Sequence, residues 1–259
     1  MKAILLGSGT SGGVPRIGND WGACDPSNPR NRRSRVSMIV ECDGQRILID
    51  TSPDLRQQLL ACDIGALDAV IWTHDHADHS HGIDDLRALY HRSRKPLPGY
   101  GKDYTLQSLV SRFDYVFETS NGYPAIVAPR LLEPEQVICG ITVRGVDQPH
   151  GPVLSTGLRF DANGLSIVYA TDFSAITDAM VALYADCDLL VTDCLRYETH
   201  PTHASLDMAL DLARRTSARH TVLTHMDKSL DYATLTAELP DGIEPGFDGL
   251  VIEAARLAR

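Results

Sequence analysis

Short apolar runs separated by turn residues recur along the chain and predict β-strands. Asp43-Gly44 divides two of these runs and DANG at 161–164 divides another two, which is the pattern of β-hairpins. The predicted strands read KAILLG, VSMIVEC, QRILID, LDAVIWT, ITVRGV, STGLRFDANGLSIVYAT (a hairpin), DLLVTDC, HTVLTH and GLVIEAA.

Helical spacing occupies several of the segments between the strands. The first predicted helix covers residues 52–64, with Ser52 as its cap and with Leu55, Leu59 and Leu60 on one face. Further helices are predicted over 82–92, 105–117, 174–185 and 205–216, and a loop over 120–130.

The order of these elements predicts an α/β (α+β) fold in which two mixed sheets pack together with helices outside. We find no repeat or linker that would divide the chain, so we predict one domain over residues 1–259. Residues 93–132 are less regular and are interpreted as an insertion of modest size. Packing in the core or between two subunits of a homodimer is its favoured use, and covering the active site is the alternative.

The charge balance restricts the partners of the chain. Its 34 acidic and 24 basic residues give a net charge of −10. A long nucleic acid or an acidic membrane would need an extended basic face, so both are predicted not to be partners. A small anionic substrate in a locally positive pocket remains compatible with this charge.

The chain gives no sign of export or of a membrane span. It has no apolar stretch of 18 or more residues, and the apolar run at its start is too short for a signal sequence. The six cysteines are scattered without a framework spacing, which favours reduced thiols. We therefore expect a cytoplasmic protein.

The most specific motif is WTHDHADHSHGIDDLR at 72–87, where a predicted buried strand ends. His74 and His76 alternate just past that strand and can converge on one ion, while Asp78 and His79 can face a second ion beside it. Imidazole and carboxylate donors suit Zn²⁺, Mn²⁺ or Fe²⁺. A charged surface loop is the alternative interpretation.

The sequence THDHADH resembles the signature of the metallo-β-lactamase superfamily, and the likeness extends from Leu5 to about Glu253. The resemblance implies a four-layer αββα sandwich with two divalent ions, Zn or Mn, at one edge of its sheets. It also implies three further ligands at strand ends, for which His150, Asp172 and His225 are the candidates, with Asp172 bridging the ions. Asp50 resembles an aspartate that orients a ligand without binding metal.

Two features resemble the phosphodiesterase branch of this superfamily, which includes phosphoribosyl cyclic phosphate phosphodiesterases and RNase Z-type enzymes. LLGSGTSGGVPRIG is similar to the glycine-rich start of that branch, and glycine lets amides approach an anion closely. His203 resembles a general acid that would protonate the leaving alkoxide, with Asp78 as the other catalytic candidate. His200 is predicted to be a surface residue.

Three residues are candidates for binding a substrate phosphate: Ser11, Arg33 and Lys228. Ser11 lies in the glycine-rich turn, and Arg33 belongs to the basic run RNRRSR. Lys228 stands where the cyclic phosphate enzymes carry a histidine for an extra structural zinc, and of the three cysteines of that site only Cys24 is present. We therefore predict no third metal.

The predicted function is metal-dependent hydrolysis of a phosphodiester in a small nucleotide or cyclic sugar phosphate. A thioesterase or lactonase would use the same ligands without His203, an RNase Z-like nuclease would need a basic arm that is missing here, and a non-catalytic metal scaffold is the third alternative. Secreted β-lactamases are set aside because they carry a signal peptide. Flavodiiron proteins are set aside because they carry a further domain.

Overall fold

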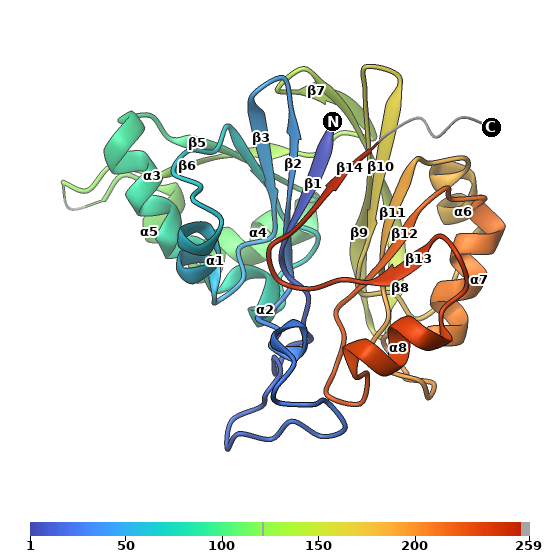
Figure 1. Ribbon diagram of the computed structural model, residues 1–259. Coiled ribbons are helices and arrows are strands. Elements are labelled where there is room, and N and C mark those ends of the chain that lie inside the picture. Colours follow the sequence, from blue (N-terminus) through green and yellow to red (C-terminus); the bar gives the residue numbers. More distant parts are fainter. Residues whose placement is uncertain (121, 255–259) are drawn as a thin grey trace.

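The computed structural model describes residues 1–120 and 122–254. Two seven-stranded sheets face each other at the centre of the molecule, and helices cover the outer face of each (Figure 1). This is the predicted αββα sandwich. Among the described residues, no helix is both long enough and apolar enough to cross a bilayer.

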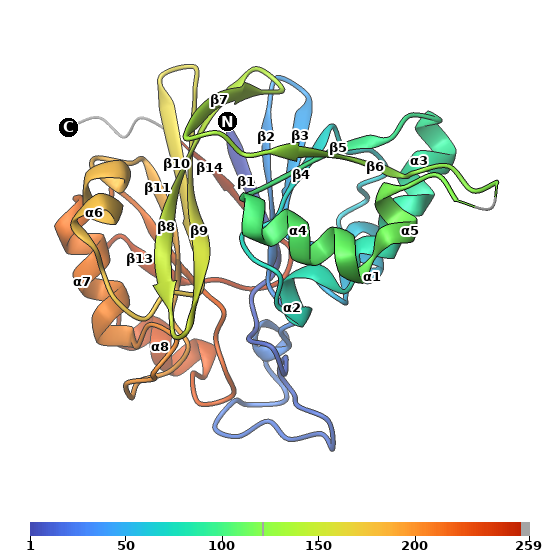
Figure 2. The same cartoon turned by 180° about the vertical axis from the view of Figure 1, so that it is seen from behind.

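The first sheet has the strand order β14-β1-β2-β3-β4-β5-β6, and its outer face carries the helices of the first half of the chain (Figure 2). Its strands are β1 (Lys2–Gly7), β2 (Ser37–Cys42), β3 (Gln45–Ile49), β4 (Ala69–Ile71), β5 (Leu97–Gly101), β6 (Val127–Leu131) and β14 (Leu250–Glu253). The helices of this half of the chain are η1 (Pro29–Asn31), α1 (Leu55–Ala61), α2 (Ala77–Ser80), η2 (Ile83–Asp85), α3 (Leu86–Ser93), α4 (Asp103–Arg112) and α5 (Asp114–Phe117). Of these, α1, α3, α4 and α5 lie on the outer face of the sheet, and α2 lies at its lower edge (Figure 2).

The second sheet has the strand order β13-β12-β11-β10-β9-β8-β7 and is covered by helices from the second half of the chain. Its strands are β7 (Glu135–Ile138), β8 (Ile141–His150), β9 (Val153–Ala162), β10 (Leu165–Ala170), β11 (Leu189–Asp193), β12 (Thr221–Thr224) and β13 (Ile243–Pro245). Its helices are α6 (Asp178–Tyr184), α7 (Leu206–Thr216) and α8 (Tyr232–Glu238).

The alternation of side chains along each strand produces the four layers. Leu5 points into the apolar layer between the sheets, whereas its neighbour Ile4 packs under the helices of the first sheet. Leu158 and Phe160 of β9 enter the same central layer from the second sheet. Both sheets are therefore covered on both faces, which fixes their strand ends relative to each other.

The first helix and the segment 93–132 differ from their predictions. α1 begins at Leu55, and Ser52 Oγ instead accepts a hydrogen bond from the amide of Asp54. Leu60 is 62% exposed, because it lies about 140° around the helix from Leu55. Residues 120–130 are not all loop, because β6 covers their end.

Segment 93–132 contributes two strands to the first sheet, β5 and β6, which pair in parallel. Both strands contain proline, and β5 also contains glycine, residues that rarely occur inside strands. Pairing with β4 stabilises β5 in spite of that composition, and β5 in turn supports β6. α4 and α5 lie between these two strands in the sequence.

Candidate metal centre

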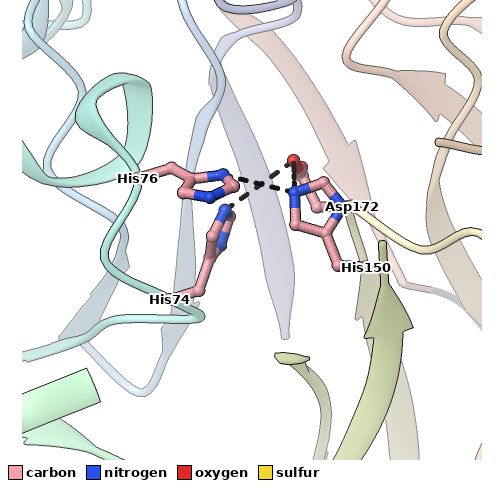
Figure 3. Close-up of side chains that lie close together, drawn as sticks. All are labelled: His74, His76, His150 and Asp172. Atoms are coloured by element: carbon pink, nitrogen blue, oxygen red, sulfur yellow. Dashed lines mark hydrogen bonds and ion pairs between the residues drawn. The ribbon is translucent and has the colours of Figure 1, made fainter. Parts of the chain in front are cut away.

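The predicted ligands meet at one edge of the two sheets, although they come from distant parts of the chain. The turn after β4 and helix α2 supply His74, His76, Asp78 and His79, and the ends of β8, β10 and β12 supply His150, Asp172 and His225. Their donor atoms form two groups: His74, His76, His150 and Asp172 in the first, and Asp78, His79 and His225 in the second. Figure 3 shows the four side chains of the first group converging.

Asp172 joins the two groups because its two carboxylate oxygens face different sides. Oδ2 lies 3.8 Å from His74 Nε2 and 3.5 Å from His150 Nε2. Oδ1 lies 3.3 Å from His79 Nε2 and 3.6 Å from His225 Nε2. Asp172 therefore stands where a ligand shared by two ions would stand.

The donor separations fit divalent ions. Four donors at 2.0–2.1 Å from a tetrahedral ion would be roughly 3.4 Å apart. His76 Nδ1 and His150 Nε2 are 3.2 Å apart, and Asp78 Oδ2 lies 3.4 Å from His225 Nε2. Among residues 1–120 and 122–254, His74 Nε2 and His79 Nε2 are buried and find no hydrogen-bond partner, which is costly for a polar atom unless an ion coordinates it.

Hydrogen bonds outside the two groups orient the ligands. Asp50 Oδ2 lies 2.7 Å from His79 Nδ1, and the same carboxylate accepts hydrogen bonds from the amide and hydroxyl of Thr73. His150 Nδ1 donates to the carbonyl of Thr202 at 2.7 Å, which leaves Nε2 with its lone pair toward the centre. The predicted position of Asp50 behind a ligand agrees with this geometry.

Three residues of the candidate metal centre have a strained backbone. Asp50, Asp172 and His225 have φ angles of +61°, +57° and +59°, in the left-handed region. Such a conformation costs about 1 kcal/mol or more for a residue with a side chain. All three follow strand ends, where the reversed backbone directs the side chain across the edge of the sheet.

The charges within the cluster set the protonation of the metal-free histidines. Burial opposes a charge on His225, but the carboxylates of Asp172 and Asp78 outweigh it and raise the pKa of His225 to about 9. The same balance, with Asp50 added, raises the pKa of His79 well above its usual value. Burial and the neighbouring His79 lower the pKa of His74.

His203 lies just before α7, and its donor atom forms a third group with those of Asp172 and His225, which also belong to the first two groups. Its Nδ1 lies 3.2 Å from Asp193 Oδ2 and 3.7 Å from Asp172 Oδ2, and its ring stacks on that of His225. His200 was predicted to be a surface residue, but it is half-buried, and its ring centroid is 5.2 Å from that of His203.

Asp193 is a site residue that was not predicted from the sequence. It ends β11, is fully buried, and has one oxygen near His203 and the other 3.6 Å from His225 Nδ1. It also accepts a hydrogen bond from the amide of Ala204. The signal was present, because Asp193 follows an apolar run as Asp50 and Asp172 do.

A pocket of about 170 Å³ opens over the two groups. Its lining combines four of the candidate metal ligands with residues of the neighbouring loops. The lining residues are Ser11, His76, Asp78, His150, Pro152, Val153, Asp172, Thr202 and His203. The predicted substrate residue Ser11 therefore lies at its wall. A larger groove of about 690 Å³ lies near β1 and α1 and shares no lining residue with it.

The structure does not place Arg33 and Lys228 where the prediction needs them. Arg33 is 2% exposed, and its guanidinium donates to the carbonyls of Asp227 and Leu230 at 3.0 and 2.7 Å. Lys228 Nζ is paired with the carboxylate of Asp20. Both cations thus hold loops together, and neither lines the pocket over the two groups, so this geometry does not support the prediction that they bind a substrate.

Helix α4 braces the metal-binding turn from outside. Arg112 Nη1 donates to the carbonyl oxygen of Asp75 at 2.5 Å, and Ser108 Oγ donates to the Asp75 carboxylate. Arg112 Nη2 also lies 2.7 Å from Nε2 of His81. Asp75 stands between His74 and His76, so segment 93–132 fixes the turn that carries them.

Comparisons with known proteins agree with this geometry. Residues 45–226 match the model of the beta-lactamase superfamily domain. A crystal structure of a diphosphatase from the PhnP family is 37% identical, with a TM-score of 0.88 and 97% of each chain covered. Zn²⁺-bound PqqB from Methylobacterium extorquens, at 19% identity and a TM-score of 0.73, shares the fold over 98% of this chain and 100% of its own.

Among curated proteins, an octanoyltransferase from Porphyromonas gingivalis is 37% identical over 96% of this chain. The chain spans about half the length of that relative, 51%. Coenzyme PQQ synthesis protein B from Xanthomonas axonopodis is 25% identical over 74% of this chain and 72% of its own length. The chain belongs to the metallo-β-lactamase superfamily, within its phosphodiesterase branch.

Proposed function

We propose that the chain is a hydrolase with a two-ion centre that cleaves a phosphodiester of a small nucleotide or a cyclic sugar phosphate. The single observation that carries the two-ion centre is the division of the Asp172 oxygens between two groups of donors. Zn²⁺ or Mn²⁺ held there would lower the pKa of a water and neutralise phosphate oxygens. The first group has three histidines and the second has two, a donor set that suits either ion.

The residues of this chain have separate tasks in the proposed reaction. Asp172 keeps the two groups of ligands together, and Asp50 holds His79 in one orientation through its 2.7 Å contact. Asp78 lines the pocket and faces His225, so it is proposed as a ligand close to the reacting phosphate. These fixed groups would bind the phosphate without rearrangement during the reaction.

His203 is proposed to protonate the leaving oxygen. It lines the pocket, and Asp193 accepts from its Nδ1, which leaves Nε2 as the nitrogen for the substrate. An alkoxide is a poor leaving group, so a proton donated to it speeds the reaction, typically by about 10²–10⁴-fold. A thioesterase or lactonase of this fold would not need such a donor, and the position of His203 therefore favours a phosphodiester.

The comparisons support phosphate chemistry without fixing the substrate. The PhnP-family relative that is similar over nearly its whole length is described as a diphosphatase. Human tRNase Z, at 19% identity, shares the fold alone, and the net charge of −10 opposes the binding of long RNA. The octanoyltransferase from Porphyromonas gingivalis has about half of its length outside the match, so its name does not identify the reaction of the matched half.

The decisive experiment compares substrate classes in one protein loaded with Zn²⁺ or Mn²⁺. We expect hydrolysis of both 2′,3′-cyclic AMP and bis(p-nitrophenyl) phosphate. His203→Ala should lower kcat by about 100-fold or more for the cyclic nucleotide, whose leaving group is an alkoxide, and much less for the nitrophenyl ester, whose leaving phenolate needs no proton. His200→Ala is the matched control, because it removes a neighbouring imidazole that does not line the pocket. Hydrolysis of an acyl thioester or a lactone with no phosphodiester cleavage would contradict the proposal.

A small phosphorylated substrate, a homodimer and a cytoplasmic location stay predictions.

A further inference from the structure

A single carboxylate outside the metal-type cluster accepts four hydrogen bonds. Asp248 Oδ1 accepts from the amide and from the hydroxyl of Ser8, both at 2.9 Å. Its Oδ2 accepts from the amide and from the hydroxyl of Ser34, at 2.7 and 2.6 Å. Because donors from two serines occupy both oxygens, this one side chain fixes two separate segments of the chain.

Asp248 lies in the segment that joins β13 to β14 and crosses from the second sheet to the first (Figure 1). The backbone on either side of it is held by one strand of each sheet. The amide of Gly246 donates to the carbonyl of Leu223 in β12, and the amide of Gly249 donates to the carbonyl of Leu5 in β1. The carboxylate therefore has a fixed position relative to both sheets.

Ser8 connects this carboxylate to the candidate metal centre. It directly follows β1, and its carbonyl accepts a hydrogen bond from the amide of Met226 at 2.9 Å. The carbonyl of Met226 accepts from the amide of Thr10 at 3.2 Å. Met226 is the residue after His225. The segment that Asp248 fixes thus holds both backbone polar groups of the residue next to a candidate ligand.

His225 depends on such support because its backbone is strained. Its φ angle is +59°, and a residue with a side chain keeps such an angle only where its surroundings fix it. Its ring is buried, and Nε2 lies 3.4 Å from Asp78 Oδ2 and 3.6 Å from Asp172 Oδ1. A shift of the backbone after His225 would therefore move Nε2 away from these carboxylates.

We propose that Asp248 is a positioning residue for the second group of donors (Asp78, His79 and His225), and that it acts on His225 through Ser8. A carboxylate only accepts hydrogen bonds, so it suits four donors. An asparagine amide at this position would direct its own N–H donors at the amide and hydroxyl of a serine. This inference rests on the two-ion centre of the proposed function and adds a residue that supports it.

The test measures zinc binding to the metal-free protein by competition with a chromogenic chelator. Asp248→Asn should raise the dissociation constant of one of the two ions by about 10- to 100-fold, as for other contacts that orient a ligand. The dissociation constant of the other ion should change by less than about twofold, because distant sites are nearly independent. A variant that only loosens the fold would weaken both ions.

Asp188→Asn is the matched control. Asp188 Oδ2 also accepts from the amide and the hydroxyl of one serine, Ser166, at 2.8 and 3.1 Å. These two residues lie at the starts of β10 and β11, whereas Asp172 and Asp193 lie at the opposite ends of the same strands. This variant should lower the midpoint of urea unfolding, as Asp248→Asn does, and leave both zinc dissociation constants unchanged.

A double-mutant cycle tests the route through the ligand. In a protein that carries His225→Ala, Asp248→Asn should change zinc affinity by less than about twofold, since the ligand on which it acts is gone. Ser8→Ala removes one of the four donors, so it should raise the same dissociation constant by a smaller factor, and it replaces Asp248→Asn if that variant does not fold. Equal weakening of both ions, unchanged constants, or a full effect of Asp248→Asn without His225 would overturn the positioning role.

Hydrolysis of 2′,3′-cyclic AMP by the unmodified protein separates the two proposals. If the cyclic nucleotide is cleaved while zinc binding does not depend on Asp248, the positioning role is refuted and the phosphodiesterase proposal stands. If no phosphodiester is cleaved but Asp248→Asn weakens zinc only in the presence of His225, the positioning role stands and the proposed reaction fails. The same dependence on His225 in a protein that binds a single zinc would support the role of Asp248 and refute the two-ion centre.

Discussion

Asp193 Oδ2 lies 3.2 Å from Nδ1 of His203, and this contact sets which imidazole nitrogen faces the pocket. Because a carboxylate only accepts hydrogen bonds, the proton on His203 Nδ1 is held and Nε2 is directed to the substrate. The buried carboxylate thereby links the proposed acid to the strand β11 of the second sheet.

Replacing Asp193 by Asn should lower kcat for a phosphodiester by about 10- to 100-fold, as for other partners that orient a functional histidine. KM should change little, because Asp193 does not line the pocket. The rates are measured with 2′,3′-cyclic AMP, whose leaving group is an alkoxide. Asp207→Asn, which changes an exposed carboxylate in the first turn of α7, is the control. An equal loss in both variants would contradict the positioning role.

Metal uptake should release protons. In the metal-free protein the raised pKa of His225, about 9, keeps this residue charged at pH 7.5, and His79 is raised in the same direction. A ligand histidine must be neutral, so binding should release about one to two protons, and affinity should rise with pH up to about 9. Calorimetry in buffers of different ionisation enthalpy measures this number. Zero release would show that both histidines are already neutral.

The same raised pKa has a consequence for stability without metal. His225 goes from an ordinary value of 6.5 to about 9 on folding. Its charge therefore stabilises the metal-free fold fully below about pH 6.5, and this contribution is lost as the pH rises through about 9. Urea unfolding of the metal-free protein across pH 6–10 should show a decrease in the free energy of unfolding as the pH rises. The zinc-loaded protein should not show this decrease.

Arg112→Ala should weaken zinc binding while leaving the fold intact. Its guanidinium holds the Asp75 carbonyl between two ligands, and loss of comparable supporting contacts lowers metal affinity by about 10- to 100-fold. Competition with a chromogenic chelator measures the dissociation constant, and circular dichroism checks the fold. Arg130→Ala, an exposed change in the same segment, is the control. Equal affinity in both variants would show that α4 does not position the turn.

Arg33→Ala should destabilise the protein by about 2–4 kcal/mol, because the carbonyls of Asp227 and Leu230 lose their buried donor. The expected change appears as a lower midpoint in urea unfolding. Arg32→Ala should stay within about 0.5 kcal/mol, since its side chain is exposed. If Arg33→Ala also lowers the stability by less than about 0.5 kcal/mol, its buried contacts do not stabilise the fold, and the sequence-based prediction that Arg33 binds a substrate phosphate would be favoured.

Most strands could be predicted because their apolar runs are bounded by turn residues, as in β2 and β3 around Asp43-Gly44. β5 was missed because LPGYG has no run of strand-forming residues, and its pairing with β4 depends on contacts distant in sequence. α8 and β13 were not predicted because each is short and shows no long periodic pattern of apolar residues.

His74, His76, Asp78 and His79 could be proposed as metal ligands from their spacing just after an apolar strand, and His150, Asp172 and His225 from the resemblance to the metallo-β-lactamase signature. The contacts by which distant residues hold these side chains in place could not be predicted from the sequence. The contact of Arg112 with Asp75 joins positions 37 residues apart and depends on how α4 lies over the turn. Arg33 looked like part of a solvated basic run, and only the packing of the loops shows that it is buried.

We propose that seven side chains hold two divalent ions, with Asp172 between them. Anomalous scattering at the zinc edge from crystals of the zinc-loaded protein would locate the ions. Two peaks are expected, one among His74, His76 and His150 and one among Asp78, His79 and His225, with a carboxylate oxygen of Asp172 facing each. A single peak, or zinc bound away from Asp172, would rule out the two-ion centre.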